Sequence, residues 1–238
     1  MRTIETCFAP PLFPHILTKE NFSVVIVDIL RATTAMCTAF EMGATEIIPV
    51  AEIEETIKYR NNGYLIAGER DGIVIDGADF GNSPFNFTRE KVNGKKIVIT
   101  TTNGTQTIKA AQISDTVVLG AFSNIAYLTD WLAKRDQNVV IFCSGWKNKF
   151  NLEDSLLAGS LAQRLLKMGF ESDCDSTKGA IDLWDIAKVD VLAYIQKASH
   201  RKRLQRLGLD DVLEYCFTLD TTSVVPLLRN DAFIDAMK

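Results

Sequence analysis

The sequence predicts an α/β fold, namely a three-layer α/β/α arrangement with a mostly parallel sheet and a helical C-terminal portion. Between residues 22 and 168, short apolar runs rich in β-branched residues alternate with amphipathic stretches of helical length. The apolar runs are unbroken and do not alternate with polar residues, which is typical of strands buried on both faces. Such strands occur in parallel sheets whose crossover helices cover both sides.

The predicted strands are residues 22–27, 46–50, 64–67, 96–100, 116–119 and 138–143. The predicted helices between and after them are residues 31–42, 52–60, 106–112, 125–134 and 152–168. Gly43 and the Asn-Asn-Gly run at 61–63 are typical stop signals for the first two helices. After Gly169 only helical patterns follow, at residues 177–196, 203–207 and 211–217.

One segment, residues 68–88, predicts a long loop because it holds four glycines, a proline and many polar residues. A connection of this length inside a compact domain is often functional. No linker, repeat or low-complexity segment interrupts the chain, so we expect a single domain over residues 1–238.

Composition excludes several classes of function. The 26 basic and 30 acidic residues leave a net charge of −4, which argues against nucleic acid or an anionic membrane as the main partner. No apolar stretch approaches the roughly 20 residues that a membrane span needs, and the N-terminal residues contain no apolar signal segment. Five cysteines without a CxxC pair are typical of reduced, buried thiols. We therefore expect a cytoplasmic protein, and the charge balance leaves room for a local basic pocket that binds a small anion. A homo-oligomer is compatible with the sequence.

Polar side chains gather where the predicted strands end. In an open parallel sheet ligands bind outside the carboxyl ends of the strands. The candidates at this edge are Asp28, Arg31, Glu69, Arg70, Thr102, Asn103, Gly104, Thr105, Ser144, Glu153 and Asp154. With Ser123 and Asn124, which follow the strand at 116–119, these residues make five polar clusters at one predicted edge and indicate a shared site.

Each candidate also has a structural interpretation. Asp28 follows a strand of pure hydrocarbon, where a carboxylate suits either a hard metal such as Mg²⁺ or the N-cap of the next helix. Arg31 and Arg70 can grip an anion or pair with a nearby carboxylate. The Thr-Asn-Gly-Thr turn at 102–105 favours an anion seat over an ordinary turn. Glu153 and Asp154 also suit a helix start because acids there favour the helix dipole.

Elimination narrows the chemistry. The chain has neither a Walker-type phosphate loop nor a dinucleotide-binding glycine pattern. Its two histidines, His15 and His200, are too few for a histidine-rich dimetal site, and we expect His200 to cap or solvate a basic helical segment. What remains is a Mg²⁺ site built from carboxylates, with arginines and hydroxyls for an anion.

At this point several motifs together resemble the 2-phosphosulfolactate phosphatase family. The motifs, in the family's order, are VDILRATT (27–34), AGERDG (67–72), GADFGNSP (77–84), TTTNGT (100–105), GAFSN (120–124), CSGW with LED (143–154) and SHRKRLQRLG (199–208). Two departures are visible: Arg201-Lys202 stand where the family usually has Gly-Arg, and Ser144 stands where it usually has Ala. The resemblance implies a Mg²⁺-dependent phosphatase that hydrolyses (2R)-2-phospho-3-sulfolactate to (2R)-3-sulfolactate and phosphate.

The resemblance also suggests roles for the candidate residues. Metal ligands would be Asp28 with Glu153 or Asp154, and Glu69 would be a base that activates water or a further ligand. The substrate-binding residues would be Arg31, Arg70, Asn82, Ser144 and the turn of Thr102, Asn103, Gly104 and Thr105. Attack on phosphorus by water, or through a phosphorylated Asp28, both stay open. So do two other functions: a non-catalytic binder of small phosphorylated or sulfonated acids, and a phosphatase of the same fold for another phosphorylated hydroxy acid.

Overall fold

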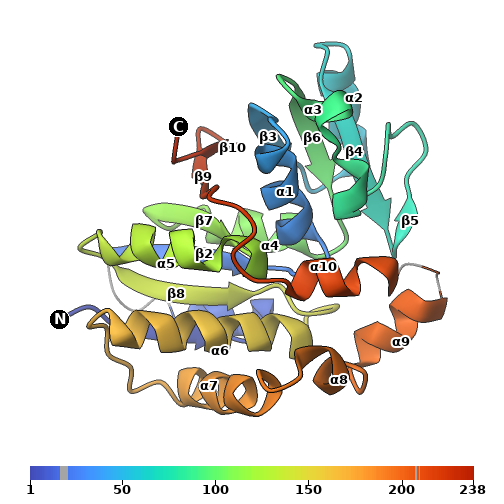
Figure 1. Ribbon diagram of the computed structural model, residues 1–238. Coiled ribbons are helices and arrows are strands. Elements are labelled where there is room, and N and C mark those ends of the chain that lie inside the picture. Colours follow the sequence, from blue (N-terminus) through green and yellow to red (C-terminus); the bar gives the residue numbers. More distant parts are fainter. Residues whose placement is uncertain (17–20, 207, 209) are drawn as a thin grey trace.

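The computed structural model describes residues 1–16, 21–206, 208 and 210–238. Within these residues, ten strands form one sheet in the order β1-β8-β2-β7-β9-β10-β3-β6-β4-β5. Most neighbouring strands are parallel, which confirms the predicted α/β class with its mostly parallel sheet (Figure 1).

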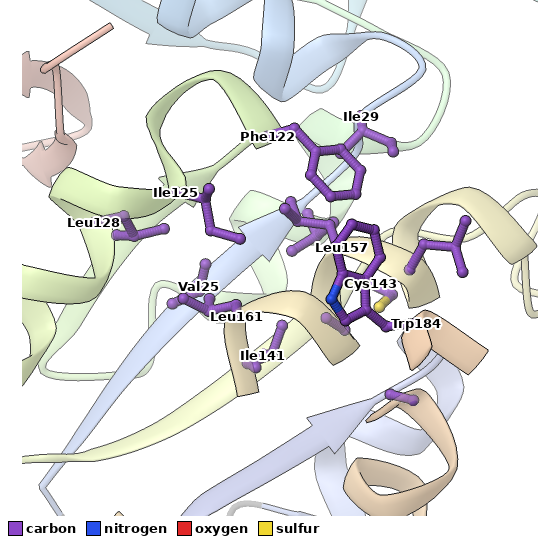
Figure 2. Packing of buried hydrophobic residues seen from close by; sticks show 14 of the residues in the cluster. Val25, Ile29, Phe122, Ile125, Leu128, Ile141, Cys143, Leu157, Leu161 and Trp184 are labelled. Atoms are coloured by element: carbon purple, nitrogen blue, oxygen red, sulfur yellow. The ribbon is translucent and has the colours of Figure 1, made fainter. Parts of the chain in front are cut away.

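The first half of the sheet consists of four parallel strands, β1 (Ile4–Cys7), β8 (Asn138–Cys143), β2 (Phe22–Val27) and β7 (Thr116–Gly120). Successive residues of β2 and β8 enter two different cores. Val25 and Ile141 pack with Leu161 on one side, as Figure 2 shows, whereas Val24 and Phe142 join the cluster on the other side. The unbroken apolar sequence thus serves two buried faces.

The second half consists of the parallel strands β3 (Glu46–Pro49), β6 (Lys96–Thr100) and β4 (Leu65–Arg70). Strand β4 is longer than predicted, so Glu69 and Arg70 lie on a strand and not in a loop. A short strand, β5 (Ile73–Val74), pairs antiparallel with its end. Strand β4 extends beyond its predicted end because Glu69 and Arg70 pair with Val74 and Ile73 of β5.

A C-terminal hairpin of β9 (Pro226–Arg229) and β10 (Ala232–Asp235) lies between the two halves. The prediction of helices alone after Gly169 is therefore wrong. Asn230 and Asp231, both with positive φ, form the tight turn. Such a pair is typical of two-residue hairpins, and this was the sequence signal for the missed strands.

The hairpin changes the direction of the sheet. It contacts β7 through Val118 and Leu227 and β3 through Phe233 and Ile47, antiparallel in both cases. With the hairpin itself this makes three reversals, so β3, β6 and β4 run opposite to β7 along the sheet. In Figure 1 the strands of one half run across the view and those of the other run down it, so that their carboxyl ends converge. The sequence predicts the candidate site residues at one edge of the sheet. The structure places them where the strand ends of the two halves meet.

The helices fill the connections. They are α1 (Ala32–Glu41), α2 (Ile53–Arg60), α3 (Arg89–Val92), α4 (Gly104–Ala111), α5 (Ile125–Ala133), α6 (Leu152–Lys167), α7 (Asp175–Ala187), α8 (Val191–Ile195), α9 (Ser199–Arg206) and α10 (Leu213–Phe217). The helix predicted at 177–196 is two helices, because the Asp190 carboxylate accepts a hydrogen bond from Ala193 N at 2.9 Å and starts α8. The helix predicted at 203–207 belongs to α9, and Leu207 lies outside the described residues. In the described part of the chain, no helix is long and apolar enough to cross a membrane.

Candidate active site

A pocket opens where the carboxyl ends of β2, β4, β6 and β8 meet helix α9. Its lining residues come from six separate stretches of the chain and are Asp28, Leu30, Arg31, Glu69, Gly72, Asn82, Thr101, Asn103, Trp146, His200, Arg203 and Leu204. Five predicted site residues, Asp28, Arg31, Glu69, Asn82 and Asn103, therefore share one pocket.

Asp28 is the carboxylate that directly follows β2. Its Oδ1 accepts a long hydrogen bond of 3.4 Å from Ala32 N, so it contributes weakly to the start of α1. Burial raises the pKa of Asp28 to about 6, and the carboxylates of Glu69 and Glu153 act in the same direction, while His200 opposes them. In the described residues no hydrogen-bond donor reaches Oδ2, which leaves one carboxylate oxygen for a ligand.

Gly104, the first residue of α4, makes room for this carboxylate. A Cβ at Gly104 would lie 2.9 Å from Asp28 Oδ2 and 2.9 Å from Ala32 Cβ. No side chain fits such an approach, so the turn needs glycine here for a steric reason. The preceding residue, Asn103, lines the pocket and accepts a hydrogen bond from Lys147 N at 3.2 Å.

Arg31 is a buried cation without an anionic partner. Its side chain is only 6% exposed, and Nη2 donates to Asn82 Oδ1 at 2.9 Å. Over the described ranges no carboxylate lies within salt-bridge distance of Arg31. Burial lowers the pKa of Arg31. Because burying an unpaired charge is costly, this guanidinium is well suited to an anionic ligand in the pocket.

Glu69 has both carboxylate oxygens occupied. Oε1 accepts from Thr102 N at 2.7 Å and from Thr102 Oγ1 at 3.0 Å, and Oε2 accepts from Gly72 N at 2.6 Å. These bonds fasten the β4–β5 turn to the turn after β6. The arrangement favours an anchoring role for Glu69 over the predicted role of base, because its lone pairs are already engaged.

Arg70 points away from the pocket. Its Nη2 donates to Ala51 O at 2.7 Å and to Thr100 Oγ1 at 2.8 Å, and Nη1 donates to Glu69 O at 2.9 Å. The structure therefore does not bring Arg70 to the predicted anion site, because its donors hold β4 to neighbouring backbone. The second arginine of the pocket is Arg203, whose guanidinium stacks on the Trp146 ring at 3.7 Å.

The remaining candidates lie just behind the pocket wall. Asp154 accepts hydrogen bonds from Ile29 N, Gly145 N and Asn151 Nδ2 at 3.0, 3.1 and 2.9 Å. Burial and the nearby carboxylates raise its pKa well above the usual value. It thereby ties the ends of β2 and β8 to the start of α6.

Ser144 and Thr105 are buried beside these turns and do not line the pocket. Thr105 Oγ1 donates to Thr101 O at 3.0 Å, and the Thr102 hydroxyl is bound to Glu69. Of the turn at 102–105 that was predicted to bind an anion, Asn103 lines the pocket and Gly104 lies against Asp28. These two residues are the ones that remain candidates for contact with an anion.

His200 is a pocket residue that the sequence interpretation missed. It does not solvate the basic segment, because its side chain is 9% exposed and its Nδ1 lies 2.6 Å from Glu153 Oε1. The imidazole stacks on Trp146 with 5.5 Å between ring centroids. Its basic neighbours in sequence concealed it, and its place in the SHRKRLQRLG motif was the one available signal.

The fold and the pocket define the class as an α/β protein with a pocket at the strand ends that brings carboxylates, a histidine and arginines together. A family model described as 2-phosphosulpholactate phosphatase matches residues 7–231, and the chain belongs to this family. Two relatives named "Probable 2-phosphosulfolactate phosphatase", from Caldanaerobacter subterraneus and Thermotoga petrophila, are each 37% identical to it. The alignments cover 89% of this chain and 89% of the first relative, and 90% of this chain and 92% of the second. A Gloeobacter violaceus protein of the same name is 37% identical over 85% of this chain and 86% of its own length.

Proposed function

We propose that this protein hydrolyses (2R)-2-phospho-3-sulfolactate to (2R)-3-sulfolactate and phosphate, with Mg²⁺ as cofactor. The names of its relatives support the substrate. The observation that carries the proposal is that Arg31 is buried, has no ion-pair partner among the described residues, and shares a pocket with the open carboxylate of Asp28. A phosphate ester supplies the negative charge that Arg31 lacks and presents its phosphorus beside Asp28.

In this proposal, two arginines bind different anionic groups of the same substrate. Arg31 is fixed by Asn82, so its fork is held ready for bidentate pairing. Arg203, on α9, lies over the Trp146 ring, with its guanidinium carbon 3.7 Å from the ring centroid. We assign the phosphate to Arg31, because it borders Asp28, and one of the acidic groups of the carbon chain to Arg203.

The donor set fits a loosely held Mg²⁺. The ion is commonly bound by one or two carboxylates together with water and substrate phosphate, and Asp28 offers one hard oxygen in the pocket. Glu153 and Asp154 do not complete the expected ligand set, because their oxygens contact His200 and three N–H donors. Consistently, no cluster of three or more metal-ligating side chains occurs in the described residues. Mg²⁺ at Asp28 would neutralise charge on the transferring phosphoryl group.

The test is phosphate release by metal-stripped protein, titrated with Mg²⁺ or Zn²⁺. The substrates are 2-phosphosulfolactate and matched phosphorylated hydroxy acids that lack the sulfonate. We expect activity only after Mg²⁺ is restored, and a higher kcat/KM for the sulfonated substrate. Full activity in stripped protein would exclude the metal requirement. Equal kcat/KM for the substrates without sulfonate would contradict the proposed substrate, and release from none of them would contradict a phosphatase.

A further inference from the structure

Helix α9 places His200 over the pocket in a fixed orientation. Glu153 on α6 holds Nδ1 at 2.6 Å, and Trp146 from the loop after β8 supports the ring face. Glu153 is 1% exposed, so water does not compete for this contact. A histidine held on two sides loses little freedom when a substrate binds, which suits a residue that must meet a reacting atom.

The contact with Glu153 also determines which nitrogen carries the proton. A carboxylate accepts hydrogen bonds, so Nδ1 is the protonated nitrogen and Nε2 keeps its lone pair. In the described part of the chain, Nε2 contacts Arg203 Nη1 at 3.5 Å, which is at the limit of a hydrogen bond and therefore weak. The lone pair of Nε2 is therefore available in the pocket.

The other two candidate bases of the pocket, Glu69 and Asp28, are less free to accept a proton than His200 Nε2. Glu69 has both oxygens bound by Thr102 and Gly72. Asp28 has one free oxygen, but the proposed function uses it for the metal. The charged groups around His200 are the carboxylates of Glu153, Asp28 and Glu69 and the guanidinium groups of Arg203 and Arg31. The three carboxylates favour a positive charge on the ring, and the two arginines oppose it.

We propose that His200 is the proton-transfer catalyst of this site and that Glu153 is its positioning residue. The proposal rests on the phosphatase function. A water oxygen forms a bond to phosphorus while one of its protons moves to Nε2, and the ester P–O bond breaks. The proton on Nε2 then passes to the departing alkoxide. The products are the hydroxy acid and inorganic phosphate, and His200 returns to its neutral form with the proton on Nδ1.

The activity test compares His200→Gln with His15→Gln. His15 is exposed in a short helical turn (Pro10–His15) outside the pocket, so it is a matched control. We expect His200→Gln to lower kcat by at least about 100-fold with a much smaller change in KM, and His15→Gln to behave as wild type. The rate of His200→Ala should be restored in part by added imidazole. An unchanged kcat in His200→Gln would overturn the proposal.

Glu153→Gln separates positioning from packing. Gln keeps the size of the side chain and removes the charge that stabilises the imidazolium. We expect kcat to fall and the acid limb of the pH–rate profile to move to lower pH, because the carboxylate that stabilises a protonated imidazole is gone. A profile that keeps its wild-type limb would show that Glu153 does not act through His200.

Imidazole ¹⁵N spectra test the same atoms without any substrate. Because the chain has two histidines, His15→Gln assigns both sets of signals. We expect His200 in the Nδ1–H form with an unprotonated Nε2 at the pH of activity. A proton on Nε2 at that pH would overturn the base role even in an active enzyme. If wild type releases phosphate from no substrate, the proposed function fails separately, and the spectra still decide the state of His200.

Discussion

Two regions around the pocket use similar residues in different ways. On the β4–β6 side, Glu69 and Arg70 have their oxygens and donors bound by the protein. On the β2 side, and within the ranges that the structure describes, no donor reaches Asp28 Oδ2, and Arg31 has one amide partner and no ion pair. The comparison shows that a charged side chain at a strand end is a candidate for chemistry when its neighbours leave it unsatisfied. The predictions below test this difference.

Asp28→Asn should have the largest effect. The change removes the open carboxylate and keeps its shape, so we expect phosphate release to fall by about 1,000-fold or more with a near-native circular dichroism spectrum. The measurement is kcat at saturating Mg²⁺. A variant that keeps about half of the wild-type rate would remove Asp28 from the mechanism.

Asp28 should also make metal-free protein less stable as the pH rises. Its pKa of about 6 in the folded state exceeds the ordinary 3.8, so the folded state binds the proton more tightly. The contribution of Asp28 to the free energy of unfolding is therefore most favourable below about pH 4. It falls as the pH rises to about 6, by at most about 3 kcal/mol. Denaturant unfolding of wild type and Asp28→Asn at both ends of this range checks the prediction. Identical pH dependence in the two proteins would contradict it.

Glu69→Gln should act mainly on stability. The new amide group meets N–H donors where an oxygen accepted them, and a buried unsatisfied group costs about 1–3 kcal/mol. We expect a lower free energy of unfolding and a smaller loss of kcat than in His200→Gln. A variant with native stability and no activity would support the predicted role of Glu69 as a base.

Arg31→Lys should weaken substrate binding about tenfold, which corresponds to about 1.4 kcal/mol. Lysine keeps the charge but cannot offer the planar fork to phosphate. The measurement is KM, or competitive inhibition by inorganic phosphate. An unchanged value for both would show that the guanidinium does not touch the anion.

Arg70→Lys is the matched change on the other side of the pocket. Because Arg70 binds Ala51 O and Thr100 Oγ1, we expect a loss of about 1 kcal/mol in stability and little change in KM. Thermal unfolding and KM are measured on the same preparation. A rise in KM as large as that of Arg31→Lys would support the predicted role of Arg70 in substrate binding.

The sequence predicted the elements that have strong local signals. The unbroken strand at 22–27 and the strand at 138–143 match β2 and β8. The hairpin of β9 and β10 escaped because each strand has only four residues and pairs with its outer neighbour at a single position. Short strands of this kind depend on tertiary packing more than on local pattern.

For the site, the order of residues along the chain already shows which polar side chains follow the strands, and it places Asp28 and Arg31 at the end of a buried strand. The contacts made on folding settle which of these side chains remain available to a ligand. Glu69 is satisfied by Thr102, 33 residues away, and His200 is positioned by Glu153, 47 residues away. A hydrogen bond is made by groups that meet in space, so a residue's own sequence neighbours do not show whether its charge is already bound or free for a ligand.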